Sequence, residues 1–305
     1  MIRKLAFVLI VLAVFNALSG CMKKAGQNSA PKVPEIKSEI RLNEEGIPLI
    51  TVYNIKEETL TEMDAESDVE GVLAGEMKND WPEEALKAQA ILARTYVMRF
   101  LTTRDSKYEG ADISTDITEA QAYSETLIND RIKKAVNDTR GLVVSYEGEL
   151  ANTWFHAHSG GVTEQPVAGL EYKENPPYTK SVKSMDSESA PKNVREWSYV
   201  FSDEQMKTAL KETGVTVEKV ESIKIGETGE SGRAVSFIIN GKTVSAPTLR
   251  INLGSDKMKS TLSTHLALTD NGVEVEGRGY GHGVGLSQWG AYAMATNGKN
   301  YEDLV

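Results

Sequence analysis

Cysteine is nearly absent from this chain of 305 residues, which contains only Cys21. A single thiol excludes an internal disulfide, and no metal site built from cysteines is available to the residues that follow it. The folded body must therefore be stabilised by an ordinary apolar core, and a chain of this length has enough residues to form one.

Positive charge is also scarce, because 34 lysines and arginines face 44 aspartates and glutamates, which gives a formal net charge of −10. Binding to nucleic-acid phosphates requires a basic surface, so we expect no nucleic-acid partner. The sequence has no nucleotide-binding loop either. The "NGKT" stretch at 240–243 has Ser236 where such a loop needs its first glycine, and the glycines of 279–285 do not follow the G-x-G-x-x-G spacing.

The apolar run near the N-terminus, Leu5 to Leu18, is shorter than the roughly 20 residues that span a membrane comfortably. It follows Arg3 and Lys4 and precedes "SGC", an order that is typical of a secretory signal peptide over residues 1–20. The "LSGC" stretch resembles the lipobox of bacterial lipoproteins, which implies that Cys21 becomes lipid-modified. An uncleaved anchor that contains a cysteine is the alternative. In both cases we expect an extracytoplasmic body that is anchored to the bacterial cell membrane.

Residues 21–45 are polar, charged and proline-bearing, as expected of a tether between a lipid and a domain. From residue 46 to residue 305 the sequence is predicted to form one folded domain. Strand-like alternation flanks Asn240-Gly241, a pair that favours a tight hairpin turn, whereas helical periodicity dominates 67–101. The combination predicts a mixed α/β (α+β) fold in which N-terminal helices pack on antiparallel β-sheets.

The stretch "SDVEGVLAGEM" has the periodicity of a helix, with Val69, Val72, Leu73 and Met77 on one stripe. Glu76 falls in the middle of this stripe. Burial raises the pKa of a carboxyl group because it disfavours the charged form. A glutamic acid that stays protonated near neutral pH is suited to the general-acid cleavage of a sugar linkage. A structural glutamate that pairs with a buried arginine is the alternative.

A second helix is predicted between Asp80, as its cap, and residue 101, with Pro82 in its first turn. Gln89 lies at the centre of its apolar face, where a buried amide must find hydrogen-bond partners. A bond to a neighbouring loop is favoured over a contact with substrate. Arg94 lies off that face and is a candidate partner for Glu76. Such an ion pair would lower the pKa of Glu76 and oppose a general-acid role.

His156 and His158 are two residues apart in "TWFHAHSGGVTE", which is predicted to be a strand that enters a glycine turn. On a strand they would share a face, and a His-x-His pair is a common metal-ligand spacing. A third ligand would have to come from His265, His282 or a carboxylate. Packing, or hydrogen bonding with the turn at 159–161, is the favoured alternative.

Glycine occupies every second position from 279 to 285 in "RGYGHGVGLSQWGAYA". If this stretch is a strand, its bare face admits a backbone or a ligand at very close range, while Tyr280 and His282 are kept for the other face. Ser287 is expected to cap the helix that follows. Strand, turn and helix start would then form a shallow polar floor with free N–H groups, which suits sugars. The alternative is a tightly packed joint in which glycine only relieves steric crowding.

Three segments, in this order, resemble the signatures of the stage II sporulation protein D and LytB domain family: "EGVLAGEMKNDWPEEALKAQAILARTYVMRF", "FHAHSGGVTE" and "GYGHGVGLSQWGAYAMA". The intermediate "DITEAQAYS" at 116–124 also matches. The resemblance covers residues 46–305. Family members usually continue past the "YEDLV" with which this sequence ends, so the resemblance implies a shortened C-terminus.

The resemblance implies a protein directed at peptidoglycan. The sporulation members are lytic transglycosylases, which cut MurNAc–GlcNAc strands already stripped of stem peptides and leave 1,6-anhydro-MurNAc ends. The glutamate of "GEM" is the family's catalytic acid and corresponds to Glu76. A glycan-binding cleft is implied beside it, and the histidine and glycine segments are expected to line it. The expected substrate-binding residues are His158, Ser159, Gly160, Gly161, Tyr280, His282, Ser287 and Gln288.

This mechanism needs one carboxylate, unlike ordinary glycosidases, in which two flank the bond. Asp112, Asp116 and Glu164 are available if a second is required. Some family members bind zinc through histidine and cysteine. The cysteine is missing here, so we expect no metal and no other cofactor. The lipoprotein-like N-terminus differs from the membrane-spanning one of the sporulation members, which leaves a vegetative role open beside sporulation.

Two other functions remain open. LytB-like relatives are named as modifiers that enhance an amidase, so the chain could be a non-catalytic module that binds glycan and recruits a cell-wall amidase. The second alternative is a metal-dependent hydrolase that uses His156, His158 and His282. Only the transglycosylase requires that loss of Glu76 abolishes cleavage.

Overall fold

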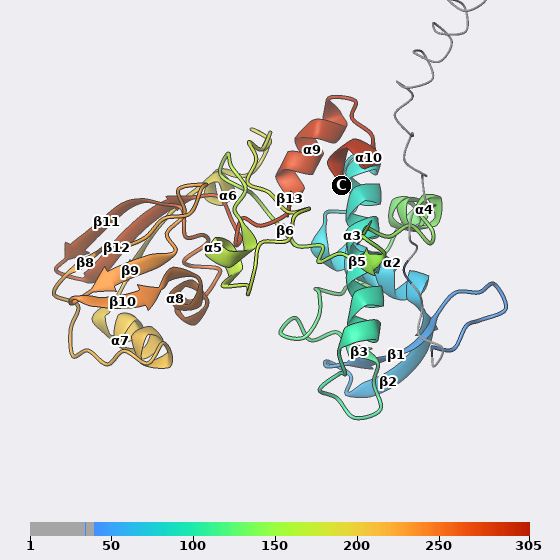
Figure 1. Cartoon of the computed structure of the whole chain (residues 1–305), viewed down its shortest axis with the longest axis horizontal. Helices are drawn as coiled ribbons and strands as arrows, with labels where there is room; N and C mark the ends of the chain where they lie inside the picture. The colour runs from blue at the N-terminus through green and yellow to red at the C-terminus, as the bar shows by residue number, and fades with distance from the viewer. Residues whose placement is uncertain (1–33, 35–39) are drawn as a thin grey trace, which may run out of the picture.

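The computed structural model describes Pro34 and residues 40–305. The predicted signal peptide and the lipidation site at Cys21 lie outside the described residues. Two lobes stand side by side, and irregular segments join them (Figure 1). Helices and small sheets occur in both, so the predicted mixed α+β class is confirmed. Within residues 40–305, no helix is both long and apolar enough to cross a membrane.

The N-terminal lobe packs helices against a small sheet of order β2-β1-β3. Its elements are β1 (Leu49–Asn54), β2 (Thr59–Asp64), α2 (Ala65–Glu76), α3 (Glu83–Thr103), β3 (Ile113–Ser114), η1 (Glu125–Leu127) and α4 (Asp130–Asp138). Strand β1 pairs antiparallel with β2 and parallel with β3. Residues 40–45, which lie in the predicted tether, contact this lobe, because Leu42 bridges to Pro48.

Helix α2 forms as its apolar periodicity predicts. The side chain of Asp64 accepts the Ser67 N–H and caps its first turn. Val69 and Leu73 are fully buried against α3 and α4, so the predicted stripe is the core-facing side. The helix ends at Glu76, and Met77 continues in an extended conformation.

Helix α3 starts later than the sequence suggests. Pro82, not Asp80, is its N-cap, and no side chain caps it. A turn in which the Trp81 N–H donates to the Lys78 carbonyl places Asp80 before the helix, so the predicted cap is wrong.

Arg94 does not pair with Glu76. Its guanidinium binds Glu66 at 2.6 Å, because Glu66 lies in the first turn of α2 and Glu76 at the opposite end. The Arg94 side chain also donates to the carbonyls of Val136 and Leu142. The expected candidate partner of Glu76 is therefore used to fasten α2, α3 and α4 together.

The C-terminal lobe is built on two antiparallel sheets, of order β11-β12-β7 and β10-β9-β8. Its elements are β7 (Glu196–Phe201), α7 (Asp203–Glu212), β8 (Ile223–Ile225), β9 (Ser236–Ile239), β10 (Lys242–Ser245), α8 (Ala246–Leu253), β11 (Ser263–Thr269) and β12 (Gly272–Arg278). Phe201, Phe237 and Leu249 fill its separate core. Asn240 and Gly241 both have positive φ, as the predicted hairpin turn requires.

In the sequence, short elements connect the two lobes and follow the second one. They are β4 (Ser145–Tyr146), β5 (Glu149–Leu150), β6 (Phe155–His156), α5 (Pro166–Leu170), α6 (Lys192–Arg195), β13 (Leu286–Ser287), α9 (Gln288–Thr296) and α10 (Tyr301–Leu304). Strand β13 pairs parallel with β6. Helix α9 then returns to the N-terminal lobe, where the Trp289 and Trp81 rings lie 4.5 Å apart between centroids. The chain therefore crosses between the lobes at two places, near 155 and near 285.

The glycine-rich stretch 279–285 is not a regular strand. Its four glycines all have positive φ, from 74° to 108°, a conformation that breaks the alternation of a strand. A Cβ on Gly285 would lie 1.9 Å from the Trp154 carbonyl oxygen, and one on Gly281 would lie 2.7 Å from the His156 Cβ. The predicted strand is wrong. Three of the four glycines face the protein's own segment 154–160, and Gly283 faces the Arg233 side chain.

Candidate functional site

Glu76 is the last residue of α2, and its side chain is half-buried. Its Oε1 accepts the backbone N–H of Ala122 at 2.7 Å. Gly75 makes this approach possible, because a Cβ there would lie 2.7 Å from the Ala122 carbonyl. The segment 116–124, one of those that carry the family resemblance, therefore packs against the helix end that holds the glutamate.

The environment of Glu76 favours its protonated form. Burial raises the pKa of this carboxyl group, and the N–H of Ala122 opposes the rise only in part. The structure gives Glu76 no salt bridge to a lysine or arginine among residues 40–305. A carboxylic acid held in this way can donate a proton and, once ionised, accept one.

Gln288, which follows the glycine-rich stretch and begins α9, makes a hydrogen bond to Glu76. Its Nε2 donates to the Glu76 backbone carbonyl at 3.1 Å. Ser287 caps α9 as predicted, since its hydroxyl accepts the Gly290 N–H. The start of α9 and the end of α2 are therefore neighbours, although they are far apart in the sequence.

Gln89 is fully buried, and neither polar atom of its amide has a hydrogen-bond partner. The predicted bond to a neighbouring loop is therefore wrong. Gln121 is also buried, and neither polar atom of its amide has a hydrogen-bond partner. The Oδ2 atom of Asp68 is likewise buried without a hydrogen-bond partner. Burial raises the pKa of Asp68 to about 7. The helical lobe thus holds three buried side chains with unpartnered polar atoms, and of these the sequence pattern had indicated only the burial of Gln89.

The turn 158–161 is organised by a residue that the sequence analysis missed, Asp186. Its carboxylate accepts the Ser159 hydroxyl, the Gly161 N–H at 3.0 Å and the Ser287 hydroxyl at 2.6 Å. Burial raises the pKa of Asp186, but the hydroxyls of Ser159 and Ser287 more than offset this, and the net pKa is lowered. Nothing in its local sequence, "SMDSES", marks it, because its partners come from two distant segments.

Tyr280 and His158 form a two-way backbone bridge, in which each N–H donates to the other's carbonyl at 2.8 and 3.0 Å. Other N–H groups of the glycine-rich stretch are used as well, since Gly279 donates to Arg195 and Gly281 to Lys259. The expected floor of free N–H groups is therefore largely absent from 279–281. The close packing matches the alternative, a joint in which glycine relieves steric crowding.

The histidines of the joint are held neutral. Burial, with Arg233 nearby, lowers the pKa of His156 to about 3, and burial lowers the pKa of His158 despite the opposing charge of Asp186. Burial of the His282 ring, with His156 beside it, lowers its pKa well below the usual value. The rings of His156 and His282 lie 5.8 Å apart between centroids. Over Pro34 and residues 40–305, no three His, Cys, Asp or Glu side chains are grouped as a metal site.

The three carboxylates considered as a second catalytic group are engaged elsewhere. Glu164 is fully buried and binds Ser231, while Asp112 accepts the Thr51 N–H in the first lobe. Asp116 binds Lys107 and Tyr108. Their contacts show structural uses, and none of these contacts is with Glu76.

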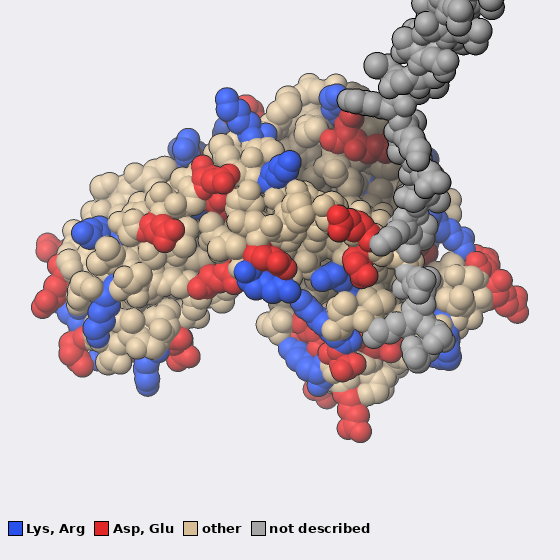
Figure 2. Space-filling model, in the orientation of Figure 1, with Lys and Arg blue, Asp and Glu red and all other residues tan. Residues whose placement is uncertain are grey.

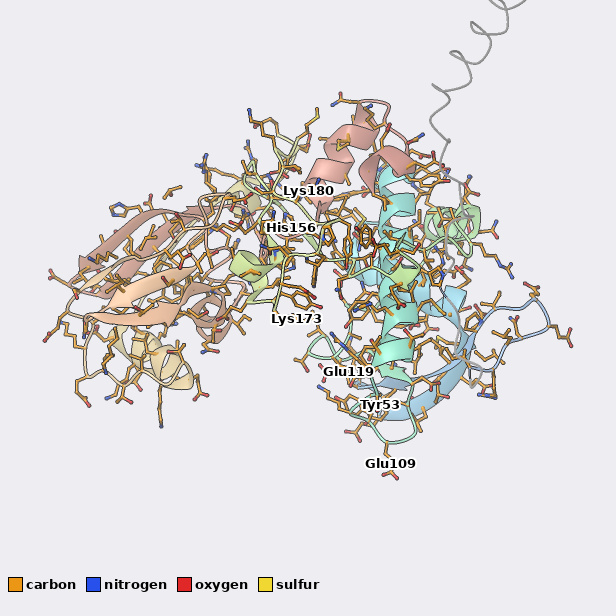
Figure 3. All side chains as sticks on the ribbon, in the orientation of Figure 1. Tyr53, Glu109, Glu119, His156, Lys173 and Lys180 are labelled. Atoms are coloured by element: carbon orange, nitrogen blue, oxygen red, sulfur yellow. The ribbon has the colours of Figure 1, made fainter. Side chains whose placement is uncertain are left out.

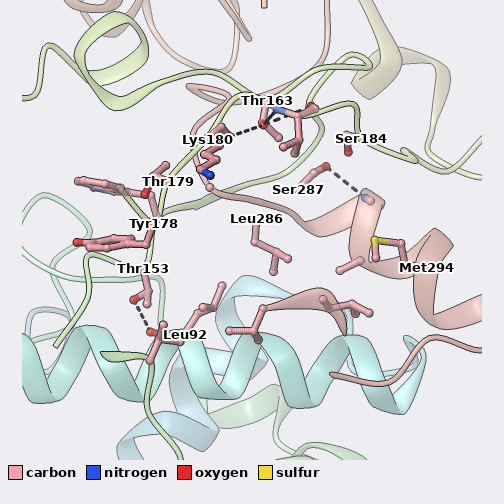
Figure 4. A pocket seen from close by; sticks show the side chains of 18 of the residues that line it. Leu92, Thr153, Thr163, Tyr178, Thr179, Lys180, Ser184, Leu286, Ser287 and Met294 are labelled. Carbon is pink, nitrogen blue, oxygen red and sulfur yellow. Dashed lines mark hydrogen bonds between the residues drawn. The ribbon is translucent and has the colours of Figure 1, made fainter. Parts of the chain in front are cut away.

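Two cavities lie near the joint. A hollow of about 300 Å³ is lined by His158, Gly160, Gly161, Asp186, Arg195 and Arg278. A larger one, of about 530 Å³, lies between Leu92, Tyr178, Leu286 and Met294 and is mainly apolar (Figure 4). Glu76 lines neither of them. The turn 158–161 is therefore the part of the predicted set that faces a polar hollow.

The outer surface shows how the two lobes meet. A notch separates the lobes on the face drawn in Figure 2, and acidic and basic side chains both border it. His156 lies at the joint, with Lys173 and Lys180 on either side of it in the view (Figure 3). Tyr53, Glu109 and Glu119 lie away from the joint, at the far end of the N-terminal lobe.

Two family models match parts of this chain. Residues 53–146 match a family described as stage II sporulation protein, and residues 175–285 match a domain family of unknown function. An uncharacterised protein of Brachyspira hyodysenteriae is 32% identical over 256 residues, which cover 83% of this chain and 67% of that protein. Stage II sporulation protein D of Bacillus subtilis is 31% identical over 274 residues, which cover 84% of this chain and 76% of that protein. An amidase enhancer of Bacillus subtilis is 28% identical over 78% of this chain and 39% of that longer protein.

Proposed function

Because the chain belongs to the stage II sporulation protein D and LytB family, whose members act on the bacterial cell wall, we propose that it is a lytic transglycosylase of peptidoglycan. It would cleave MurNAc–GlcNAc strands that have lost their stem peptides and leave 1,6-anhydro-MurNAc ends. The observation that carries the proposal is Glu76, a half-buried acid with a raised pKa at the end of α2.

In the proposed reaction, protonated Glu76 donates its proton to the glycosidic oxygen as the bond from that oxygen to the MurNAc anomeric carbon breaks. The leaving sugar departs with a free hydroxyl. The Glu76 carboxylate then takes the proton from the 6-hydroxyl of the MurNAc. That oxygen bonds to the anomeric carbon and closes the anhydro ring, which returns Glu76 to its acid form.

Two features support a single-carboxylate reaction. The raised pKa keeps a proton on Glu76 at the start of the cycle, since burial penalises the charged form. The Ala122 N–H contacts Oε1 at 2.7 Å and stabilises the carboxylate that forms after the proton leaves. Asp112, Asp116 and Glu164 are engaged elsewhere, so the proposal assigns them no step.

The glycan would be held beside Glu76 by the turn 158–161 and by the start of α9. His158, Ser159, Gly160 and Gly161 border the polar hollow or its loop, and Gln288 touches the Glu76 backbone. Tyr280 and His282, from the glycine-rich stretch, are the remaining proposed substrate-binding residues. We propose an extracytoplasmic location with a lipid on Cys21, in sporulation or in vegetative wall turnover.

The alternative is a non-catalytic module that binds glycan and enhances a cell-wall amidase. It is favoured by the likeness to the amidase enhancer, although this chain covers only 39% of that protein. Such a module would still bind strands, but it would need neither the acid form of Glu76 nor its side chain.

The deciding experiment uses purified protein on peptide-free glycan strands, with products identified by mass spectrometry. Glu76→Gln should reduce anhydro-ended products by about 10²–10⁴-fold, because general-acid catalysis contributes on that order. Glu70→Gln is the matched control, since Glu70 lies on the same helix and burial also raises its pKa. It should cleave at the wild-type rate.

Intact strands with the wild type, together with retained strand binding, would exclude the transglycosylase and favour the amidase-enhancing module. The pH profile gives a further check. The acid form of Glu76 starts the reaction, so activity should be lost as pH rises through its raised pKa. A chelator should leave the rate unchanged. Loss of activity on chelation would instead favour a metal-dependent hydrolase built on His156, His158 and His282.

A further inference from the structure

Asp186 lies where the turn 158–161 meets the start of α9, and its side chain is only 7% exposed. Both carboxylate oxygens contact the turn, Oδ2 through the Gly161 N–H at 3.0 Å and Oδ1 through the Ser159 N–H at 3.3 Å. Oδ1 alone also accepts the Ser287 hydroxyl, at 2.6 Å. One buried carboxylate therefore fastens two segments that are more than a hundred residues apart in the sequence.

From Ser287 a continuous line of contacts leads to Glu76. The Ser287 hydroxyl accepts the Gly290 N–H and caps α9. The next residue, Gln288, donates to the Glu76 carbonyl at 3.1 Å. The turn 158–161 belongs to the joint and Glu76 to the first lobe. Backbone bonds such as Trp289 N–H to the Ala157 carbonyl, at 3.0 Å, already join the two segments, and Asp186 adds a side-chain tie at the turn itself.

We propose that Asp186 is a positioning residue that fixes the turn 158–161 relative to Glu76 and so holds a bound glycan strand against the acid. The role rests on the proposed transglycosylase function. An ionised carboxylate suits it, because the hydroxyls of Ser159 and Ser287 and the Gly161 N–H all donate to Asp186. An amide at this place has one acceptor oxygen and turns two N–H groups toward donors.

The first test is Asp186→Asn, assayed on peptide-free strands. We expect kcat to fall by about 10- to 100-fold, because a shift of about 1 Å in a bound reactant costs on that order. The KM for strands should change little, and the pH at which activity is lost should stay where Glu76 puts it. A fall in strand affinity with unchanged kcat would overturn the proposal.

Glu66→Gln is the matched control for losing a largely buried carboxylate. Glu66 binds Arg94 at the other end of α2 and touches neither the turn nor α9. The control should lower the melting temperature while it leaves kcat and KM of the folded protein unchanged. An equal loss of kcat in Glu66→Gln would reduce the effect of Asp186 to general destabilisation.

A double-mutant cycle tests the route through Ser287. Ser287→Gly removes the hydroxyl from Asp186, and glycine is tolerated at a helix N-cap with a small loss. If Asp186 acts through Ser287, the double variant should lose no more kcat than the worse single variant. Losses that multiply would show two independent effects and overturn the proposed route.

Amide hydrogen exchange separates this proposal from the proposed function. Ser287→Gly should speed the exchange of the Gly161 amide, which Ser287 does not touch, and leave the amides of β12 unchanged. A Gly161 amide that exchanges at the wild-type rate would overturn the tie even if strands are cleaved. A wild-type protein that cleaves no strands would refute the transglycosylase, while faster Gly161 exchange would still establish Asp186 as the fastener of the joint.

Discussion

The glycines of α2 and those of 279–285 are used in different ways. Gly71 and Gly75 have ordinary helical backbones, and the space left by their missing Cβ atoms is filled by Tyr123 and by the Ala122 backbone. Gly281 and Gly285 also leave space for a neighbouring segment, but their φ values are positive as well. The first pair needs glycine for space alone, and the second needs it for both space and backbone conformation.

This difference explains why one sequence pattern predicted its structure and the other did not. In a helix, glycine leaves the apolar period of 3.6 residues intact, so Val69 and Leu73 still indicate the buried side. In 279–285 the alternating glycines imitate the period of a strand. Their positive φ turns the chain at every second residue, and side chains such as Tyr280 do not alternate across a sheet.

The largest effect is expected for Gly285→Ala. The added Cβ would lie 1.9 Å from the Trp154 carbonyl oxygen at a residue with φ of 74°. Neither the backbone neighbour nor the residue's own conformation can adapt cheaply, so we expect a loss of more than about 3 kcal/mol of unfolding free energy. Chemical denaturation of the purified variant, or its failure to accumulate in soluble form, measures this.

Gly298→Ala is the matched control for the conformational part of that effect. Gly298 has φ of 82°, and nothing lies within 4 Å of its missing Cβ. Strain alone should cost about 1 kcal/mol. Equal losses at Gly285 and Gly298 would show that the Trp154 backbone does not crowd the joint, contrary to the close packing described above.

A smaller effect is expected for Gly71→Ala in α2. The Cβ would lie 2.1 Å from the Tyr123 ring, while φ stays helical. Crowding of this kind costs about 1–3 kcal/mol. Because the neighbour is a side chain, Gly71→Ala with Tyr123→Leu should recover part of the loss in a denaturation measurement. A double variant that is no more stable than Gly71→Ala would place the conflict in the backbone, as at Gly285.

The smallest effect is expected for Asp68→Asn, one turn before Gly71. Burial raises the pKa of Asp68 to about 7, from its ordinary value of 3.8, so the folded protein holds a proton that the unfolded chain has lost between about pH 4 and 7. Stability should therefore fall as pH rises through that window in the wild type. The amide of the variant cannot ionise, so Asp68→Asn should gain stability relative to the wild type as the pH rises toward 8.

Melting temperatures of both proteins from pH 4 to pH 8 check this sign. The wild-type curve should slope downward more steeply than that of the variant. Parallel curves would mean that Asp68 is ionised in the fold at all these pH values, contrary to its burial without a partner for Oδ2.

Part of the fold and of the candidate site follows from local sequence. The periodicity of α2 indicated its buried side and put Glu76 within it, Asn240-Gly241 indicated a hairpin, and Ser287 indicated a helix cap. These features depend on residues within a few positions of one another. The cap at Asp80 failed for the opposite reason, because the turn at Lys78–Trp81 displaced the helix start.

What the sequence alone determined about this protein is the set of local periods, turns and caps, and with them the acid at the end of α2. Only the tertiary structure decided the partners that lie far along the chain. Arg94 pairs with Glu66 because Glu66 lies at the near end of α2, and Asp186 joins the turn 158–161 to Ser287 because two crossings between the lobes bring them together. Short-range preferences act through neighbouring backbone groups, whereas the partner of a buried charge is fixed by which distant segment the packed lobes place beside it.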